Sequence, residues 1–270
     1  MTVATGLNMF FISLWALHGS RYFLQQENRN RTKTARASYV LGASTWLFCS
    51  CDPLANLSTT NLSAHMMTQL AIMMIATPLV LLSKPSLGIS SPKMENLKTN
   101  QIWVRTKTSS QHPIFTWAIF VAALIAIHMP NIVNWAYLNP IGSRLTQALL
   151  LPVIAALYFQ PILQSQKHEF SFALRIMSLF LMMIPETMIG FFIYIQNRII
   201  YRDFLPGTNL DISLSQQQLA GALMWSMSMI VDSIWIAVAV QRWFESEKQE
   251  GQKINAEIYA ENEALGLEQN

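Results

Sequence analysis

Histidine, methionine and cysteine side chains recur at the ends of apolar stretches in this sequence. His65 and Met66 open one such stretch. His128 and Met129 stand near the end of a second, and Cys51 lies at the end of a third. Thioether, thiolate and imidazole groups are the ligands that Cu(I) prefers, and the two sulfur groups disfavour harder cations. These residue types suggest a soft-metal site wherever the fold brings the three stretches together.

The composition indicates that a membrane protein must position these side chains. Of the 270 residues, 52% are hydrophobic and 12% are charged, whereas charged residues make up about 25% of a soluble domain. A bilayer core takes roughly 20 apolar residues per helix. Runs of about that length occur seven times, and none alternates in the way of a membrane strand. The fold class we predict is all-α, a polytopic bundle with helices at 4–24, 38–55, 64–82, 114–135, 145–163, 174–195 and 218–240.

The positions of lysine and arginine predict the orientation of this bundle. Most of them follow the first, third and fifth predicted helices or lie in the carboxyl-terminal tail. By the positive-inside rule, the amino terminus lies outside and the carboxyl terminus in the cytoplasm. Residues 1–244 then form the membrane domain and 245–270 an acidic cytoplasmic tail. The basic loop at 84–112 is interpreted as lying against anionic lipid headgroups, and no nucleic-acid partner is expected.

This topology places the candidate ligands at one depth, near the outer face. His65 and Gln69 are four residues apart and share a helical face. Polar groups in a bilayer usually turn toward a bundle interior or a water-filled cavity. Each histidine could equally be a hydrogen-bonded packing residue. Most methionines, Met73 and Met74 among them, are expected to fill gaps between helices.

Two acidic residues lie deep in predicted helices. Glu186 follows Pro185 near the middle of 174–195, and Asp232 lies slightly below the middle of 218–240. Each would cost about 2.5 to 3.5 kcal/mol at the centre of a lipid-exposed helix, so both should face inward, protonated or paired. A proton relay or cation path is one interpretation, and an interhelical hydrogen bond is the other.

Several short motifs, taken in order, resemble a known family. They are CDPL at 51–54 followed by SAHM at 63–66, ATPL at 76–79, HMP at 128–130, IP at 184–185 with Gly190, and QQLAG at 217–221 with MW at 224–225. In order and depth they resemble the membrane-spanning CtaG-type cytochrome c oxidase assembly factors. The resemblance implies a seven-helix protein of the bacterial inner (plasma) membrane. It also implies heme-copper oxidase subunits as partners and copper handling at the outer face.

The sequence departs from the family pattern at three positions. Gln69 stands where the family usually has a second histidine, Gln147 where it tends to have another, and Gln216 where it has an aspartate. A glutamine oxygen is a poor Cu(I) ligand. Metal binding is therefore either lost here or retained through sulfur from Cys49, Cys51, Met66 or Met129.

The first hypothesis is a non-catalytic oxidase assembly factor that holds Cu(I). Its predicted ligands are His65, His128, Met66, Met129 and Cys51. A metal-free scaffold for oxidase subunits is the second hypothesis. A proton- or cation-coupled transporter using Glu186 and Asp232 is the third. No phosphate-binding loop, nucleophile elbow or zinc-protease motif occurs, so an enzyme is not expected.

Overall fold

The computed structural model describes residues 3–24, 32–83, 112–163, 171–204 and 210–264, and the regular structure within them is helical. Two segments, η1 and η2, are π-helical turns inside longer helices. The elements are α1 (Val3–Leu24), α3 (Lys33–Ser50), α4 (Leu54–Thr60), α5 (Leu62–Leu70), η1 (Ala71–Ala76), α6 (Thr77–Leu82), α8 (Pro113–Ile127), α9 (Pro130–Leu138), α10 (Pro140–Leu145), η2 (Thr146–Leu150), α11 (Leu151–Leu163), α12 (Phe172–Ile195) and α13 (Leu210–Ala264).

Four continuous helical segments of the described chain are long and apolar enough to cross a membrane. They are Leu62–Leu82, Pro140–Leu163, Phe172–Ile195 and Leu210–Tyr259. A bent pair, α8 with α9, would make a fifth crossing. The predicted helices at 4–24 and 38–55 coincide with most of α1 and α3, which are less apolar than these five segments. The predicted basic loop, apart from His112, falls outside the described residues.

Two predicted helices are interrupted, in each case near a proline. α3 ends at Ser50 instead of continuing to residue 55, and Pro53 precedes the short helix α4. The predicted helix 114–135 bends by 62° between α8 and α9. Pro130 has no backbone N–H and disfavours helical geometry at the residue before it. Met129 is accordingly extended, with φ −62° and ψ 136°.

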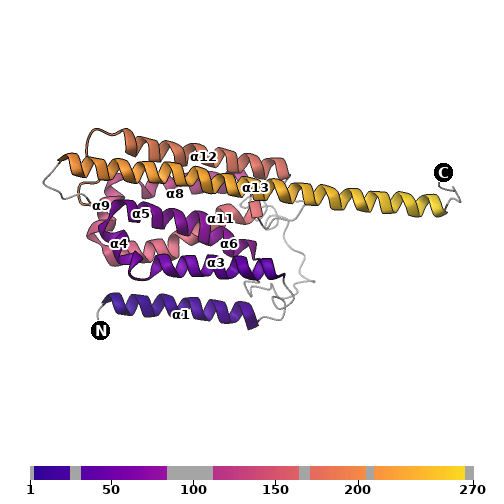
Figure 1. Ribbon diagram of the computed structural model, residues 1–270, viewed down its shortest axis with the longest axis horizontal. Helices are drawn as coiled ribbons and strands as arrows, with labels where there is room; N and C mark the ends of the chain where they lie inside the picture. Colours follow the sequence, from indigo (N-terminus) through magenta and orange to yellow (C-terminus); the bar gives the residue numbers. More distant parts are fainter. Residues whose placement is uncertain (1–2, 25–31, 84–111, 164–170, 205–209, 265–270) are drawn as a thin grey trace, which may run out of the picture.

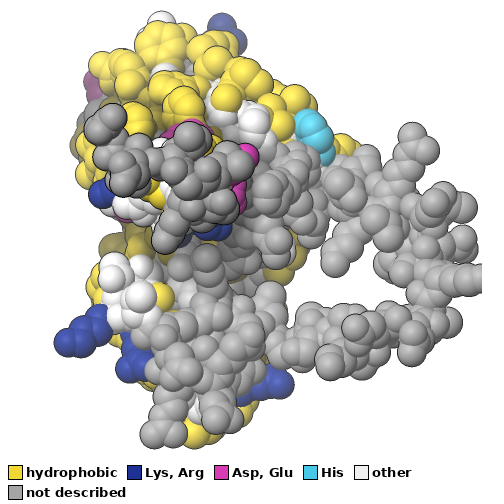
Figure 2. Space-filling model, turned by 90° about the vertical axis from the view of Figure 1, so that its right-hand side faces the viewer, with side chains coloured by type: hydrophobic (Ala, Val, Ile, Leu, Met, Phe, Trp, Pro, Cys, Tyr) yellow, Lys and Arg dark blue, Asp and Glu magenta, His cyan; other side chains and the backbone are white. Residues whose placement is uncertain are grey.

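The helices run lengthwise beside one another (Figure 1). α1 lies along one edge of the bundle next to α3, and α12 and α13 lie along the opposite edge. α1 begins and α13 ends at opposite ends of the bundle, and α13 projects far beyond the other helices. Residues 245–264 of the predicted tail therefore continue the last helix without a break. Seen from this projecting end, Lys and Arg side chains lie around the periphery (Figure 2).

Two tryptophans satisfy backbone carbonyls that prolines leave without a partner. Proline lacks the N–H that would bond the carbonyl four residues earlier. Pro78 thus frees the carbonyl of Met74, which accepts a hydrogen bond from the indole of Trp235 at 2.6 Å. In the same way, the carbonyl of Ala148, four residues before Pro152, accepts from the indole of Trp46 at 2.7 Å. Both pairs join helices that are distant in the sequence.

α12 and α13 approach each other most closely at two glycines. A Cβ atom on Gly221 would lie 2.6 Å from the backbone nitrogen of Tyr194 and 2.7 Å from the carbonyl oxygen of Gly190. A Cβ on Gly190 would lie 2.7 Å from the nitrogen of Trp225. Small residues allow helix backbones to pack this tightly inside a membrane.

Gly221→Ala should therefore destabilise the protein. The added methyl group meets backbone atoms that cannot move aside alone, so we expect a loss of about 1–3 kcal/mol. Gly251→Ala is the matched control, because nothing lies within 4 Å of its Cβ position. Thermal unfolding in detergent measures both variants. Equal midpoints for the two would contradict the close packing.

Trp235→Phe should destabilise the protein by about 1–3 kcal/mol, because the buried carbonyl of Met74 loses its indole donor. Trp225→Phe is the control, since that indole donates only to the thioether of Met229 at an exposed position. A smaller loss in Trp235→Phe than in Trp225→Phe would show that the carbonyl does not need the indole. The readout is the same unfolding midpoint.

Candidate functional site

His65 lies at the start of α5 with both ring nitrogens occupied. Its Nδ1 donates to the carbonyl of Ser58 at 3.1 Å, and the amide of Gln147 lies 2.9 Å from the same nitrogen. Its Nε2 lies 3.1 Å from the amide nitrogen of Gln69 and accepts that hydrogen bond. The ring also contacts Phe204 at a centroid distance of 5.0 Å. His65 is thus held by protein groups on every side.

His128 lies at the bend between α8 and α9 and has one ring nitrogen available. Its Nδ1 lies 2.8 Å from the carbonyl of Leu124. A carbonyl can only accept, so Nδ1 carries the proton and Nε2 keeps a lone pair. No described residue forms a hydrogen bond with Nε2. The side chain is 8% exposed, and its imidazole is close enough to His65 for the two to interact electrostatically.

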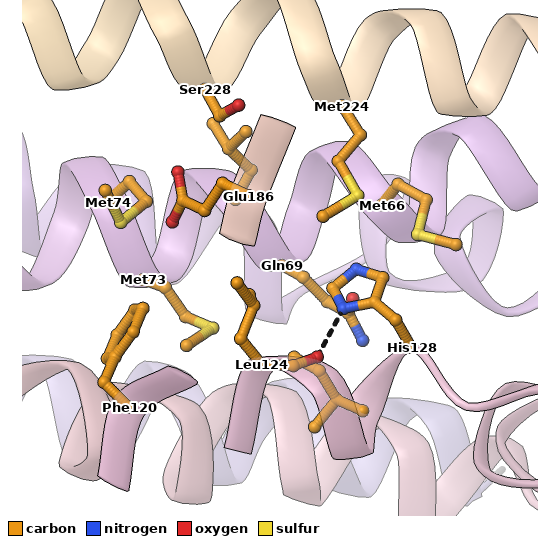
Figure 3. A pocket seen from close by; sticks show the side chains of 12 residues that line it. Met66, Gln69, Met73, Met74, Phe120, Leu124, His128, Glu186, Met224 and Ser228 are labelled. Carbon is orange, nitrogen blue, oxygen red and sulfur yellow. Dashed lines mark hydrogen bonds between the residues drawn. The ribbon is translucent and has the colours of Figure 1, made fainter. Parts of the chain in front are cut away.

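A small cavity lies beside His128 in the interior of the bundle (Figure 3). Its volume is about 20 Å³, enough for one water molecule or one ion. Thioethers from two helices line it together with His128 and Gln69. They belong to Met66, Met73, Met74 and Met224.

The groups around this cavity offer lone pairs. The thioethers and imidazole Nε2 are soft donors of the kind that Cu(I) prefers. Gln69 is 94% buried, and its Oε1 has no hydrogen-bond partner among the described residues. No group of three His, Cys, Asp or Glu residues in the described chain could hold a metal ion. A metal in this cavity would therefore be held mainly by thioether sulfur and one imidazole, which fits Cu(I) and not a harder cation.

The other predicted ligands lie elsewhere. Met129, next to His128, is 53% exposed and lines an open groove of about 320 Å³ between α8, α9 and α12. The thiol of Cys51 points to the carbonyl of Asn8, at 3.9 Å. Cys51 does not line the cavity. His128, Met66 and Gln69 thus line the cavity, and His65 lies next to it through its hydrogen bond with Gln69, whereas Met129 and Cys51 do not line it.

A polar network beside Cys51 joins α1 to two other helices. Arg144, which is 7% exposed, donates to the side-chain oxygen of Asn8 at 2.6 Å and to the carbonyl of Ser50 at 3.3 Å. It also forms an ion pair with Asp52 at 3.5 Å. Asn8 in turn donates to the carboxylate of Asp52 at 2.8 Å.

Residues 196–204, which follow α12, contact His128. The hydroxyl of Tyr201 donates to the backbone carbonyl of His128 at 2.9 Å. Burial raises the pKa of Tyr201, so this hydroxyl keeps its proton. Gln217 accepts from the backbone of Ile200 at 2.8 Å and donates to the carbonyl of Arg198 at 3.0 Å. The glutamine thereby fixes the segment that carries Tyr201.

Of the four thioethers around the cavity, the sequence alone predicts Met66 as a ligand. It places Met224 near the same membrane face as His65 and His128 but outside the predicted ligand set, and it assigns Met73 and Met74 to packing between helices. A helical signal was available, because Met66, Gln69 and Met73 are spaced by three and four residues and share one face. Nothing in the sequence assigns Met224 on α13 to that face.

Arg144→Ala should destabilise the protein by about 1–3 kcal/mol, because Asp52 and Asn8 lose a charged hydrogen-bonding partner. α1 should then become more accessible to protease in detergent. Arg198→Ala is the control, since that side chain is exposed. Unchanged cleavage of α1 in Arg144→Ala would show that the network does not anchor this helix.

Comparison with known proteins gives one match. A family model described as cytochrome c oxidase caa3 assembly factor matches residues 9–246. No curated protein and no solved structure matches the chain.

Proposed function

The chain belongs to the cytochrome c oxidase caa3 assembly factor family, and from this premise we propose that it assists oxidase assembly by holding Cu(I). Copper is here a cargo and not a resident cofactor. The proposed role is non-catalytic: the protein binds the ion and passes it on. The proposed partners are subunits of a heme-copper oxidase.

The proposal includes the location and topology of the protein. The five apolar segments, together with α1 and α3, would give seven crossings of the bacterial inner membrane. The amino terminus would lie outside and the carboxyl terminus in the cytoplasm. Basic side chains support this orientation, because Arg21 lies in the last turn of α1 and Lys33 begins α3 at the projecting end of the bundle. His65 and His128 would then both lie toward the outer face.

One observation carries the copper proposal. A neutral imidazole with an open Nε2 lines the same cavity as buried thioethers. We assign Cu(I) binding to His128, Met66 and Met224. A hydrogen bond from Nδ1 to a backbone carbonyl fixes the tautomer and the orientation of a metal-binding histidine, and Leu124 provides that carbonyl.

His65 would act as a positioning residue through Gln69. The amide nitrogen of Gln69 donates to His65, and this leaves its oxygen without a partner beside the cavity. Met129 lies in the groove on the other side of His128, where a thioether could receive the ion from outside. Cys51 has no part in the proposed ligand set, because its thiol lies in the Arg144 network.

His128→Ala should weaken Cu(I) binding by at least about tenfold, since even residues that only support metal ligands contribute about 10- to 100-fold. Met66→Leu and Met224→Leu should act in the same direction while preserving the side-chain volume. The measurement is competition of the reduced, detergent-solubilised protein with a chromophoric Cu(I) chelator. Met177→Leu is the control, because that thioether is 47% exposed on α12.

Stoichiometric binding that survives in His128→Ala would contradict this ligand set. The copper claim would fail if the wild-type protein bound no Cu(I). The engagement of both His65 nitrogens by protein groups favours the metal-free scaffold as the second candidate. That function predicts oxidase assembly in cells that depends on the protein but is unaffected by His128→Ala.

A further inference from the structure

An acidic side chain lines the cavity at the end away from His128. Glu186 on α12 is 97% buried and lines the cavity with Met73 and Met74 (Figure 3). Its Oε2 has no hydrogen-bond partner among the described residues. Pro185 directly precedes it inside the helix.

A second carboxyl group lies next to Glu186 but outside the cavity lining. Asp232 on α13 is fully buried, and its carboxyl group lies within hydrogen-bonding reach of the carboxyl group of Glu186. One of the two groups must carry a proton to make that bond. Neither carboxyl group forms an ion pair with a described residue. No cationic side chain of the described chain therefore compensates this pair.

The other polar side chains and the thioethers that line the cavity are electron-pair donors, so a cation is the partner that fits Glu186. Thioethers, a neutral imidazole and the unpartnered oxygen of Gln69 face the space, and all of them donate electron pairs without carrying charge. A unit positive charge surrounded only by neutral ligands in a low-dielectric interior is costly unless an opposite charge lies near it. Among the described residues that line the cavity, Glu186 is the acidic one.

We infer that Glu186 supplies the negative charge that neutralises Cu(I) in this cavity. The inference rests on the proposed copper function and adds a residue to it. Soft donors would select the metal at the His128 end, and the carboxylate would balance its charge from the Glu186 end. Asp232 lies behind Glu186, where the close packing of α12 and α13 at Gly190 and Gly221 brings it, and it does not line the cavity.

The test compares two isosteric substitutions of buried carboxyl groups. Glu186→Gln replaces the carboxyl group that faces the cavity, and Asp232→Asn replaces the one that does not. Cu(I) affinity of the full chain in detergent is measured by chelator competition under reducing conditions and repeated with redox-inert Ag(I). We expect Glu186→Gln to weaken binding by at least about tenfold, as the loss of a close charge pair does. Asp232→Asn should stay within about threefold of the wild type.

Glu186→Asp keeps the charge on a shorter side chain and should bind Cu(I) more tightly than Glu186→Gln. This comparison distinguishes loss of the negative charge from loss of folding. The thermal unfolding midpoint of each variant is measured as well. The inference is overturned if Glu186→Gln binds like the wild type, or if Asp232→Asn weakens binding equally. If Glu186→Gln keeps wild-type affinity while His128→Ala loses Cu(I) binding, the inference about Glu186 fails and the proposed copper function stands. Absence of Cu(I) binding in the wild type would remove the proposed function as well.

Discussion

A bundle surrounded by hydrocarbon must satisfy its polar groups from within, because lipid offers no hydrogen bonds. This constraint explains two hydrogen bonds between helices that are far apart in the sequence. Pro78 and Pro152 each leave a carbonyl without its helical donor, and an indole from another helix replaces that donor in both places. The prolines thus create acceptors that only particular partner helices can satisfy, and the pairing contributes to the register of the bundle.

The same constraint applies to the buried polar groups that have no hydrogen-bond partner among the described residues. Both ring nitrogens of His65 have a protein partner, because Nδ1 donates to the carbonyl of Ser58 and Nε2 accepts from the amide of Gln69. A few ångströms along the same helix face, Gln69 turns an unpartnered oxygen toward a cavity that also holds Glu186 and the open nitrogen of His128. Buried acceptors without donors are rare in proteins. Their concentration in one cavity is the observation that supports the proposed copper site.

Hydropathy and charge in the sequence predicted the all-helical architecture and most helix positions, because bilayer thickness sets the number of apolar residues in each membrane-spanning helix. The predicted topology placed the candidate ligands His65, His128, Met66, Met129 and Cys51 at one depth, and of these His128 and Met66 line the cavity. The family match agrees with the resemblance in the motifs. The direction of individual thioethers could not be predicted. Met129 and His128 are adjacent in the chain at the bend before Pro130, yet Met129 lines the groove alone, whereas His128 lines both the groove and the cavity. Met224 reaches the cavity only through the packing of α13, which depends on its glycine contacts with α12.

α13 is one helix of 55 residues, with no interruption between the segment that carries Met224 and its free end. At 1.5 Å per residue, it is a rod of about 80 Å. A rod without a hinge converts a small tilt at its buried part into a larger sweep at its tip, in proportion to the distance between them. Any tilt of the segment that carries Met224 would therefore be reproduced, enlarged, at the projecting end of α13.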